Sequence, residues 1–141
     1  MTPLFSCIRL EVMSADLLKE FVELKHPFHE RVLGDHITLE FKKGLDLGGL
    51  PLGDRVGFKI VGYDRNKFVQ CVKVKILDKR IRCANNHPHI TISVSKEGRP
   101  VQSNDLLEEE SYLSPEGMEG TLTFYGQVGF VTTEGEYRTH E

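Results

Sequence analysis

The stretch "NNHPHITISV" (85–94) repeats an earlier stretch, "DHITLEF" (35–41), at the same phase. In both, His-Ile-Thr is followed by a further apolar residue, and the two histidines lie 53 positions apart. Apolar residues at every second position predict a β-strand with one buried face. We therefore expect two strands that present the same pair of polar side chains.

Side chains at positions i and i+2 of a strand lie on one face. His36 and Thr38 are thus expected to share a face, as are His89 and Thr91. The apolar residues of both strands should turn toward the core: Ile37, Leu39, Phe41, Ile90, Ile92 and Val94. If the two strands lie side by side, two imidazoles and two hydroxyls meet in one cleft.

Two imidazoles and two hydroxyls are suited to phosphodiester hydrolysis without a metal. A neutral imidazole takes a proton from the attacking water and a protonated one gives a proton to the leaving oxygen, since free imidazole titrates near ~6.5. Threonine hydroxyls donate to the phosphate oxygens. We expect His36 and His89 to be catalytic and Thr38 and Thr91 to bind phosphate. The alternative is a pair of half-buried strand histidines without a catalytic role.

A metal site is a competing interpretation, because His87 and His89 also form a His-x-His pair. Such a site needs a third ligand, and no spacing favours one of the candidates over another: His26, His29 or Asp35. We therefore expect neither a metal nor another cofactor. His87 is then interpreted as a residue at the rim that contacts substrate. Tyr125 could stack on a base, or it could be a core aromatic.

The patterns in the first half of the chain predict a strand, a helix and a hairpin. Alternation predicts a strand over 4–12. A helix is expected over 14–26, with Ser14 as its N-cap. The apolar face of this helix should contain Leu17, Leu18, Phe21, Val22 and Leu24. Residues 55–63 and 67–76 predict a β-hairpin around "DRN".

The second half of the chain predicts a short helix within 102–113, capped by Ser103 or Asn104. One or two strands should follow over 119–132, broken or bulged near Gly126, and the tail 133–141 should be frayed. The predicted order is strand, helix, strand, long loop, hairpin, strand, short helix and closing strands. This order of elements indicates an α+β fold with mostly antiparallel sheet.

Length and composition indicate an ordinary soluble protein. The 141 residues are expected to form one domain, 1–141, with 39% hydrophobic and 28% charged residues. The net charge of −3 argues against binding of duplex DNA. Three cysteines in apolar segments fit reduced thiols in the cytoplasm or the nucleus. The N-terminus has no signal peptide or membrane span, so we expect no membrane association.

"DHITLEF" and "PHITISV" resemble the two His-x-Thr/Ser motifs of the 2H (two-histidine) phosphoesterase superfamily. The resemblance implies a bilobal, pseudo-twofold α+β fold with helices packed outside and a central cleft. It implies that His36 and His89 transfer protons, that Thr38 and Thr91 bind phosphate oxygens, and that no metal is required.

The resemblance also implies a substrate. The expected reaction is hydrolysis of a 2′,3′-cyclic phosphate at an RNA end or on a small nucleotide, leaving a 2′-phosphate. Two alternatives are cleavage of 2′,5′-linked oligoadenylate and non-hydrolytic binding of a nucleotide or RNA in the same cleft. The short chain is similar to the cyclic phosphodiesterase modules found with RNA ligases. We expect a monomer that acts alone or beside an RNA ligase or kinase.

Overall fold

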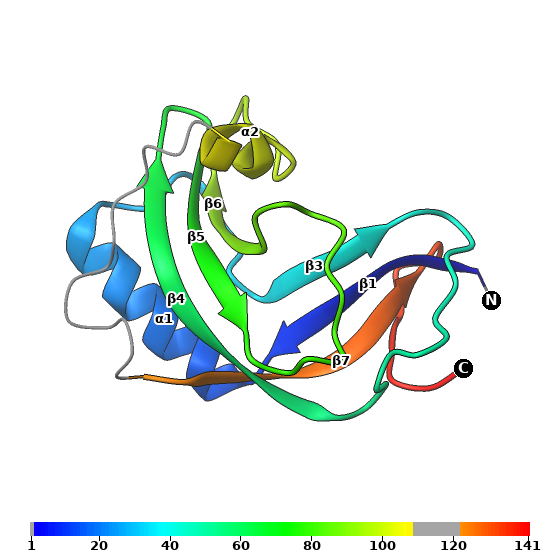
Figure 1. Cartoon of the computed structure of the whole chain (residues 1–141). Coiled ribbons are helices and arrows are strands. Elements are labelled where there is room, and N and C mark those ends of the chain that lie inside the picture. Colours follow the sequence, from blue (N-terminus) through cyan, green and yellow to red (C-terminus); the bar gives the residue numbers. More distant parts are fainter. Residues whose placement is uncertain (1, 109–121) are drawn as a thin grey trace.

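The computed structural model describes residues 2–108 and 122–141, which form eight strands and two helices (Figure 1). In chain order these are β1 (Pro3–Leu10), α1 (Val12–Lys25), β2 (Arg31–Val32), β3 (His36–Phe41), β4 (Arg55–Arg65), β5 (Val69–Ile76), β6 (His89–Val94), α2 (Gln102–Glu108), β7 (Phe124–Thr132) and β8 (Tyr137–Arg138). Every strand pair among them is antiparallel. The predicted α+β fold with mostly antiparallel sheet is confirmed.

One sheet contains all of the strands, in the order β2-β6-β5-β4-β7-β1-β3, with β8 paired to β7. β3 lies at one end of this order and β6 near the other, yet the two strands contact each other. The sheet is therefore strongly curved. Figure 1 shows β4, β5 and β6 as one group of strands beside a second group of β1, β3 and β7.

The link between β2 and β3 fixes the approach of the two motif strands. The Gly34 amide donates to the carbonyl of Thr91 in β6 (2.9 Å). The carbonyl of the next residue, Asp35, accepts from the amide of Leu10 in β1 (2.8 Å). The chain thus leaves β6 and joins β1 within one residue, immediately before His36. Gly34 has φ +74°, a conformation that glycine adopts without the steric penalty of a side chain.

Each motif strand contains a β-bulge directly after its threonine. The extra residue is Leu39 in β3 and Ile92 in β6. Both are buried. The cross-strand pairs that flank the two bulges are Cys7–Thr38, Ser6–Glu40, Cys71–Thr91 and Gln70–Ser93. A bulge inserts one residue, so the alternation of faces is reversed beyond it.

The bulges correct two of our sequence-based assignments. Phe41 and Val94 were expected on the core face, but the reversed alternation turns both to the face of the histidines. Phe41 pairs with Phe5 of β1 and is 66% exposed. Val94 is buried in a small apolar cluster beneath α2. The remaining apolar residues of the two motifs lie in the main core, as predicted.

Helix α1 differs from the prediction at its start and on its exposed side. It begins at Val12, with Glu11 at the N-cap position and no side-chain cap. Ser14 is therefore not the cap, and its hydroxyl accepts a hydrogen bond from the Tyr125 amide of β7 (3.1 Å). The buried residues of α1 are Ala15, Leu18 and Val22. Leu17 and Leu24 are exposed, because the sheet covers only a narrow stripe of the helix.

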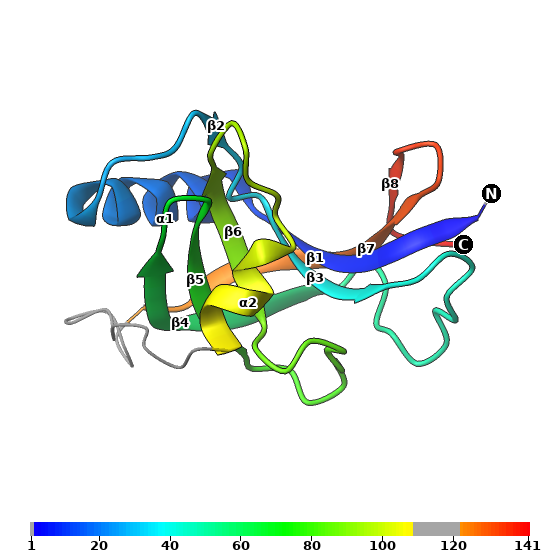
Figure 2. The same ribbon diagram turned by 90° about the horizontal axis from the view of Figure 1, so that it is seen from above.

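Helix α2 lies on the side of the sheet opposite α1 (Figure 2). Ser103 and Asn104 lie inside this helix, so neither is its N-cap. Leu106 and Leu107 pack with Val69, Cys71 and Val94 of β5 and β6. The part of the predicted helix beyond residue 108 lies outside the described residues. α2 therefore covers one half of the face that bears the histidines.

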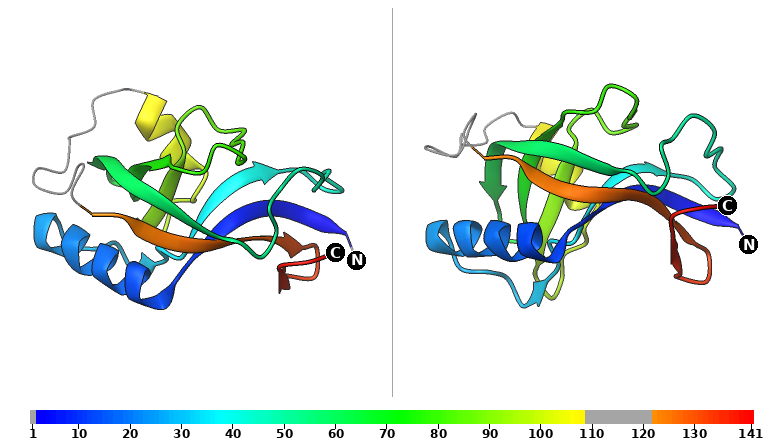
Figure 3. Two further views of the ribbon diagram at one scale, coloured as in Figure 1. Left: turned by 60° about the horizontal axis from the view of Figure 1, so that its bottom comes forward. Right: turned by 90° about the horizontal axis from the view of Figure 1, so that it is seen from below.

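The C-terminal segment is more regular than expected. β7 pairs without a break through Gly126, whose missing side chain allows close packing: a Cβ there would lie 2.5 Å from Cγ2 of Ile8. The tail also forms a strand, β8, which turns back beside the end of β7 (Figure 3). Within the described residues, no helix has the length and apolar character needed to cross a membrane.

Candidate active site

The four predicted site residues line one cleft. His36, Thr38, His89 and Thr91 all border an opening of about 450 Å³. Its volume falls within the range of small-molecule sites, about 300–1,000 Å³. β3 supplies His36 and Thr38, and β6 supplies His89 and Thr91. The two strands approach each other because the chain crosses from β6 to β1 at Gly34. The cleft therefore brings together segments that are distant in sequence.

His36 is the more accessible of the two histidines, with 37% of its side chain exposed. Its Nδ1 lies 2.7 Å from Oδ1 of Asp35, the residue before it. This hydrogen bond holds the pKa of the Asp35 carboxyl below its usual value. The same bond holds the His36 ring in place and leaves its Nε2 for another partner.

His89 is buried, at 8% exposure. Its Nδ1 donates to the backbone carbonyl of His87 (2.8 Å), which leaves Nε2 as the unprotonated nitrogen of the neutral ring. Burial lowers the pKa of His89, and the charges of His36 and His87 lower it further. His89 is therefore neutral near pH 7, because its ordinary pKa is only about 6.5.

The two threonines differ in their hydrogen bonds. The Oγ1 of Thr91 lies 2.9 Å from the hydroxyl of Ser103, which is completely buried in α2, and also donates weakly to the Pro100 carbonyl (3.4 Å). Within residues 2–108 and 122–141, the hydroxyl of Thr38 has no such partner. Its backbone carbonyl accepts from Nδ2 of Asn85 (3.4 Å) and from Sγ of Cys83 (3.6 Å). Thr38 is thus free to bind a ligand, whereas Thr91 is held in place by α2.

His87 and Tyr125, the two other predicted substrate contacts, do not line the cleft. Nε2 of His87 faces a carboxylate oxygen of Glu108 at 3.4 Å, and the side chain is only 12% exposed. His87 is nevertheless close enough to His89 to lower its pKa. Tyr125 lies on β7, where the guanidinium of Arg55 covers its ring at 3.7 Å.

Eight further residues line the cleft and were not predicted as site residues: Phe5, Leu33, Phe41, Asn85, Arg99, Pro100, Val101 and Asn104. Arg99 is exposed and is the one lysine or arginine among the described residues that line the cleft. Asp35, which orients His36, was considered only as a metal ligand. Its position directly before the motif was the available signal. Phe41 could not be found by alternation because the bulge reverses its direction.

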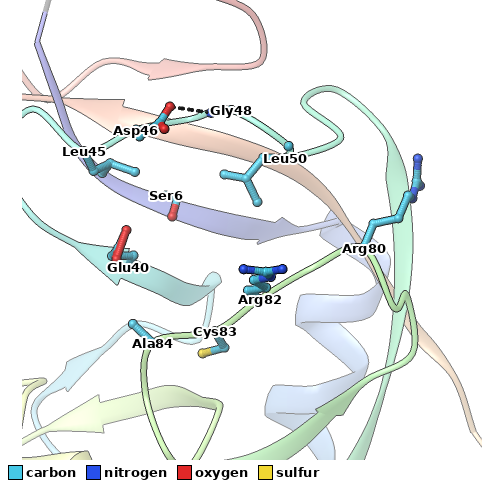
Figure 4. Close-up of a pocket in the computed structure, with 11 residues that line it drawn as sticks. Ser6, Glu40, Leu45, Asp46, Gly48, Leu50, Arg80, Arg82, Cys83 and Ala84 are labelled. Carbon is cyan, nitrogen blue, oxygen red and sulfur yellow. Dashed lines mark hydrogen bonds between the residues drawn. The ribbon is translucent and has the colours of Figure 1, made fainter.

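A larger cavity, of about 690 Å³, lies on the other face of β1 and β3 (Figure 4). Ser6 and Glu40 border it from the two strands, and Arg82 and Cys83 border it from the segment after β5. It contains no histidine and shares no residue with the cleft. The two motif histidines therefore lie in the smaller cleft and not in this cavity.

Cys7 and Cys71 lie directly opposite the two motif threonines, but neither is a plausible nucleophile. Burial raises the pKa of each thiol to about 12, so both remain protonated near neutral pH. In the described part of the chain, no group of three or more histidine, cysteine, aspartate or glutamate residues is placed to hold a metal ion.

The family of the chain follows from a sequence comparison. The family described as "Fungal tRNA ligase phosphodiesterase domain" matches residues 54–133, more than half of the chain. The chain belongs to this family. It is a 2H phosphoesterase family, so the resemblance inferred from the two motifs is confirmed. The matched residues of this 2H domain include the second motif and not the first. No curated protein matches significantly.

A solved structure supports the same fold for the 2H domain. The structure, titled "Crystal Structure of Fungal RNA Kinase", aligns with 96% of this chain at a TM-score of 0.56 and 18% sequence identity. The chain spans 44% of that protein's length. At this identity the similarity shows a shared fold and carries no activity with it.

Proposed function

We propose that this 2H domain hydrolyses a 2′,3′-cyclic phosphate, at an RNA end, to a 2′-phosphate. The observation that carries the proposal is the similar hydrogen bonding of the two histidine rings. Both line one cleft and both are bonded through Nδ1, to Asp35 and to the His87 carbonyl. Each ring is therefore left with Nε2 as its reactive nitrogen.

The unequal surroundings of the rings support an assignment of base and acid. Neutral His89 takes a proton on Nε2 from water, whose oxygen attacks phosphorus. The bond from phosphorus to O3′ breaks, and O3′ takes the proton from Nε2 of His36. The products are a 2′-phosphate and a 3′-hydroxyl. Burial favours the neutral form of His89 for the first step, and the bond to Asp35 orients His36 for the last.

Three further groups support binding of the phosphate. Thr38 and Thr91 place hydroxyls in the cleft from opposite strands, where they donate to the non-bridging oxygens. Arg99 contributes a positive charge at the edge of α2. No step requires a metal ion in this scheme, since the proton transfers and the charge stabilisation are supplied by side chains.

The pairing pattern supports a pseudo-twofold, bilobal arrangement. The six longer strands follow the order β6-β5-β4-β7-β1-β3, which has a motif strand at each end. The two motif strands have bulges at the same position, and a cysteine faces each motif threonine. The proposed lobes are β1, β3 and β7 on one side, and β4, β5 and β6 on the other, with the cleft between them.

The family name supports RNA as the substrate class, since it refers to the phosphodiesterase domain of tRNA ligases. The structural neighbour is titled an RNA kinase. We infer that the chain acts on a cleaved RNA end, in concert with ligase or kinase activity. The protein has a net charge of −3, but the positive charge of Arg99 lies at the cleft, where it can attract an RNA phosphate.

Turnover of an RNA oligonucleotide that ends in a 2′,3′-cyclic phosphate tests the proposal. We expect a 2′-phosphate product, formed equally well with excess EDTA, and loss of the activity in both His36→Ala and His89→Ala. His140→Ala, which changes an exposed histidine outside the cleft lining, is the control and should leave the activity unchanged.

Other outcomes would favour other functions. Nucleotide binding without turnover would support a binding module instead. Preferred cleavage of 2′,5′-linked oligoadenylate would replace the substrate, and loss with EDTA reversed by zinc would support a metal site.

A further inference from the structure

A second opening, of about 390 Å³, adjoins the cleft, and His36 borders both. Arg9 of β1 and Tyr137 of β8 also line this second opening. Arg9 is the direct cross-strand partner of His36. Side chains paired in this way lie on one face of the sheet, with their Cβ atoms about 4.5–5.5 Å apart. The second opening therefore places a guanidinium beside the proposed acid.

The guanidinium of Arg9 is held in place and still available to a ligand. Arg9 is exposed, and its guanidinium lies 4.9 Å from the centroid of the Tyr137 ring. In residues 2–108 and 122–141 this guanidinium forms no ion pair and no hydrogen bond. A cation above an aromatic ring is attracted by the ring but keeps its N–H donors for other partners. Arg9 can therefore bind an anion without breaking another bond.

The C-terminal strand supports Arg9 through Tyr137. Tyr137 pairs with Val131 of β7, and its ring lies against Gly129, where a Cβ would be 2.6 Å from Cε1 of the ring. The Tyr137 hydroxyl donates to the carbonyl of Gln127 in the same strand (3.0 Å). A glycine on β7 and a strand formed by the tail thus fix the aromatic ring that holds Arg9.

The direction of the proposed reaction places the rest of an RNA chain on this side. If His36 protonates O3′, the ribose that carries O3′ lies on the His36 side of phosphorus. The phosphodiester that joins this ribose to the preceding nucleotide is attached through O5′ of the same sugar. It therefore leaves the cleft past His36, toward the opening that Arg9 lines. This step rests on the proposed function and on its assignment of the acid.

We propose that Arg9 binds the phosphodiester between the terminal nucleotide and the one before it, so that the domain selects an RNA end over a free cyclic mononucleotide. A guanidinium suits this ligand, because its N–H donors match two phosphate oxygens. Asp35 is the one carboxylate among the described residues that line the second opening, and it is bonded to His36. A backbone contact carries no sequence information, so RNA ends of any sequence are accepted.

The test compares adenosine 2′,3′-cyclic phosphate with the dinucleotide ApA that ends in the same cyclic phosphate. Wild-type protein should have a kcat/KM about 5- to 50-fold higher for the dinucleotide, mainly through a lower KM, since a charge-assisted hydrogen bond is added. Arg9→Gln should remove most of this preference. Arg82→Gln, which changes an exposed arginine at the other cavity, should keep it. A preference that survives Arg9→Gln, or that the wild type lacks, would overturn the proposal.

A dinucleotide with a neutral methylphosphonate at its internal linkage isolates the charge. Wild-type protein should lose the same factor on this substrate as Arg9→Gln loses on the natural dinucleotide. The two changes together should cost little more than either alone, because both remove one contact. Losses that multiply would show that Arg9 does not act on this phosphate and would reject the proposal.

The salt dependence of KM gives an independent readout. For the natural dinucleotide, Arg9→Gln should reduce the slope of log KM against log salt concentration by about 0.7, the contribution of one phosphate contact with a single strand. A merely structural role of Arg9 would leave this slope unchanged, and an unchanged slope would contradict the proposal.

Variants of Tyr137 test the support of Arg9. Tyr137→Ala should reduce the preference for the dinucleotide by about 2- to 5-fold, because the ring no longer holds the guanidinium. Tyr137→Phe keeps the ring and should keep most of the preference. Equal losses in the two variants would contradict a role for the ring.

Failure of the proposed function would give a different result. If wild-type protein turns over neither substrate, the phosphodiesterase proposal is wrong. The phosphate contact is then decided by calorimetric binding of the dinucleotide ApA that ends in a 2′-phosphate. A Kd raised about 5-fold or more in Arg9→Gln supports the contact, and a smaller change rejects it.

Discussion

The two His-Ile-Thr motifs have the same local structure and opposite surroundings. On β3 the histidine is partly exposed, bonded to a carboxylate and bordered by open aromatic rings. On β6 the histidine is buried, bonded to a carbonyl, and its threonine is tied to a helix. In the proposed mechanism, identical short sequences therefore hold an acid and a base, because the groups that surround each ring differ.

Replacement of either histidine should have the largest effect on activity. We expect His36→Ala and His89→Ala each to reduce kcat by about 10²- to 10⁴-fold. A cyclic phosphorothiolate with sulfur in place of O3′ then separates their roles, since a thiolate leaves without protonation. His36→Ala should recover much of its activity on this substrate and His89→Ala should not. The reverse pattern would exchange the acid and the base.

The threonines should show the next largest difference, in stability rather than in rate. Both Thr38→Ala and Thr91→Ala should lower kcat by about 10²-fold, since each removes one donor to the phosphate. Thr91→Ala should also reduce the free energy of unfolding by about 0.5–1.5 kcal/mol, because Ser103 loses a hydrogen bond. Thr38→Ala should stay within about 0.5 kcal/mol of wild type. Urea unfolding measures both; equal losses would remove the distinction between the two sites.

Asp35→Asn should produce the smallest effect and sharpens the account of the acid. The change weakens the bond that orients the His36 ring, so kcat should fall while KM changes little. The fall should be less than about 10-fold, because the pair is exposed and such an interaction contributes about 1 kcal/mol or less. The acidic limb of the pH profile, set by the lowered pKa of His89, should remain below about pH 6.5. Asp16→Asn, an exposed control on α1, should leave kcat and the profile unchanged.

The sequence was sufficient to predict the α+β class, the hairpin and the two motif strands, because alternation and turn residues are local signals. Parity placed each histidine and its threonine on one face of a strand, and the structure brings both pairs to one cleft. That these four side chains form the active site stays a prediction. The same parity failed one step later at Phe41 and Val94, where a bulge depends on pairing with a distant strand.

Other errors have a similar origin in tertiary contacts. Ser14 and Ser103 look like helix caps, yet their hydroxyls bond to β7 and to Thr91. Gly126 looks like a break, but close packing against β1 explains it. The different environments of His36 and His89 could not be predicted either, since the burial of His89 and its bond to the His87 carbonyl appear only in three dimensions.

The central claim is that both imidazoles converge on one phosphorus from opposite sides. A crystal structure with bound adenosine 2′-monophosphate tests it most directly. We predict the phosphate between the two rings, with Nε2 of His36 and Nε2 of His89 each about 2.6–3.2 Å from a phosphate oxygen. A phosphate bound by only one histidine, or bound beside Arg82 in the cavity on the other face of β3, would contradict the account.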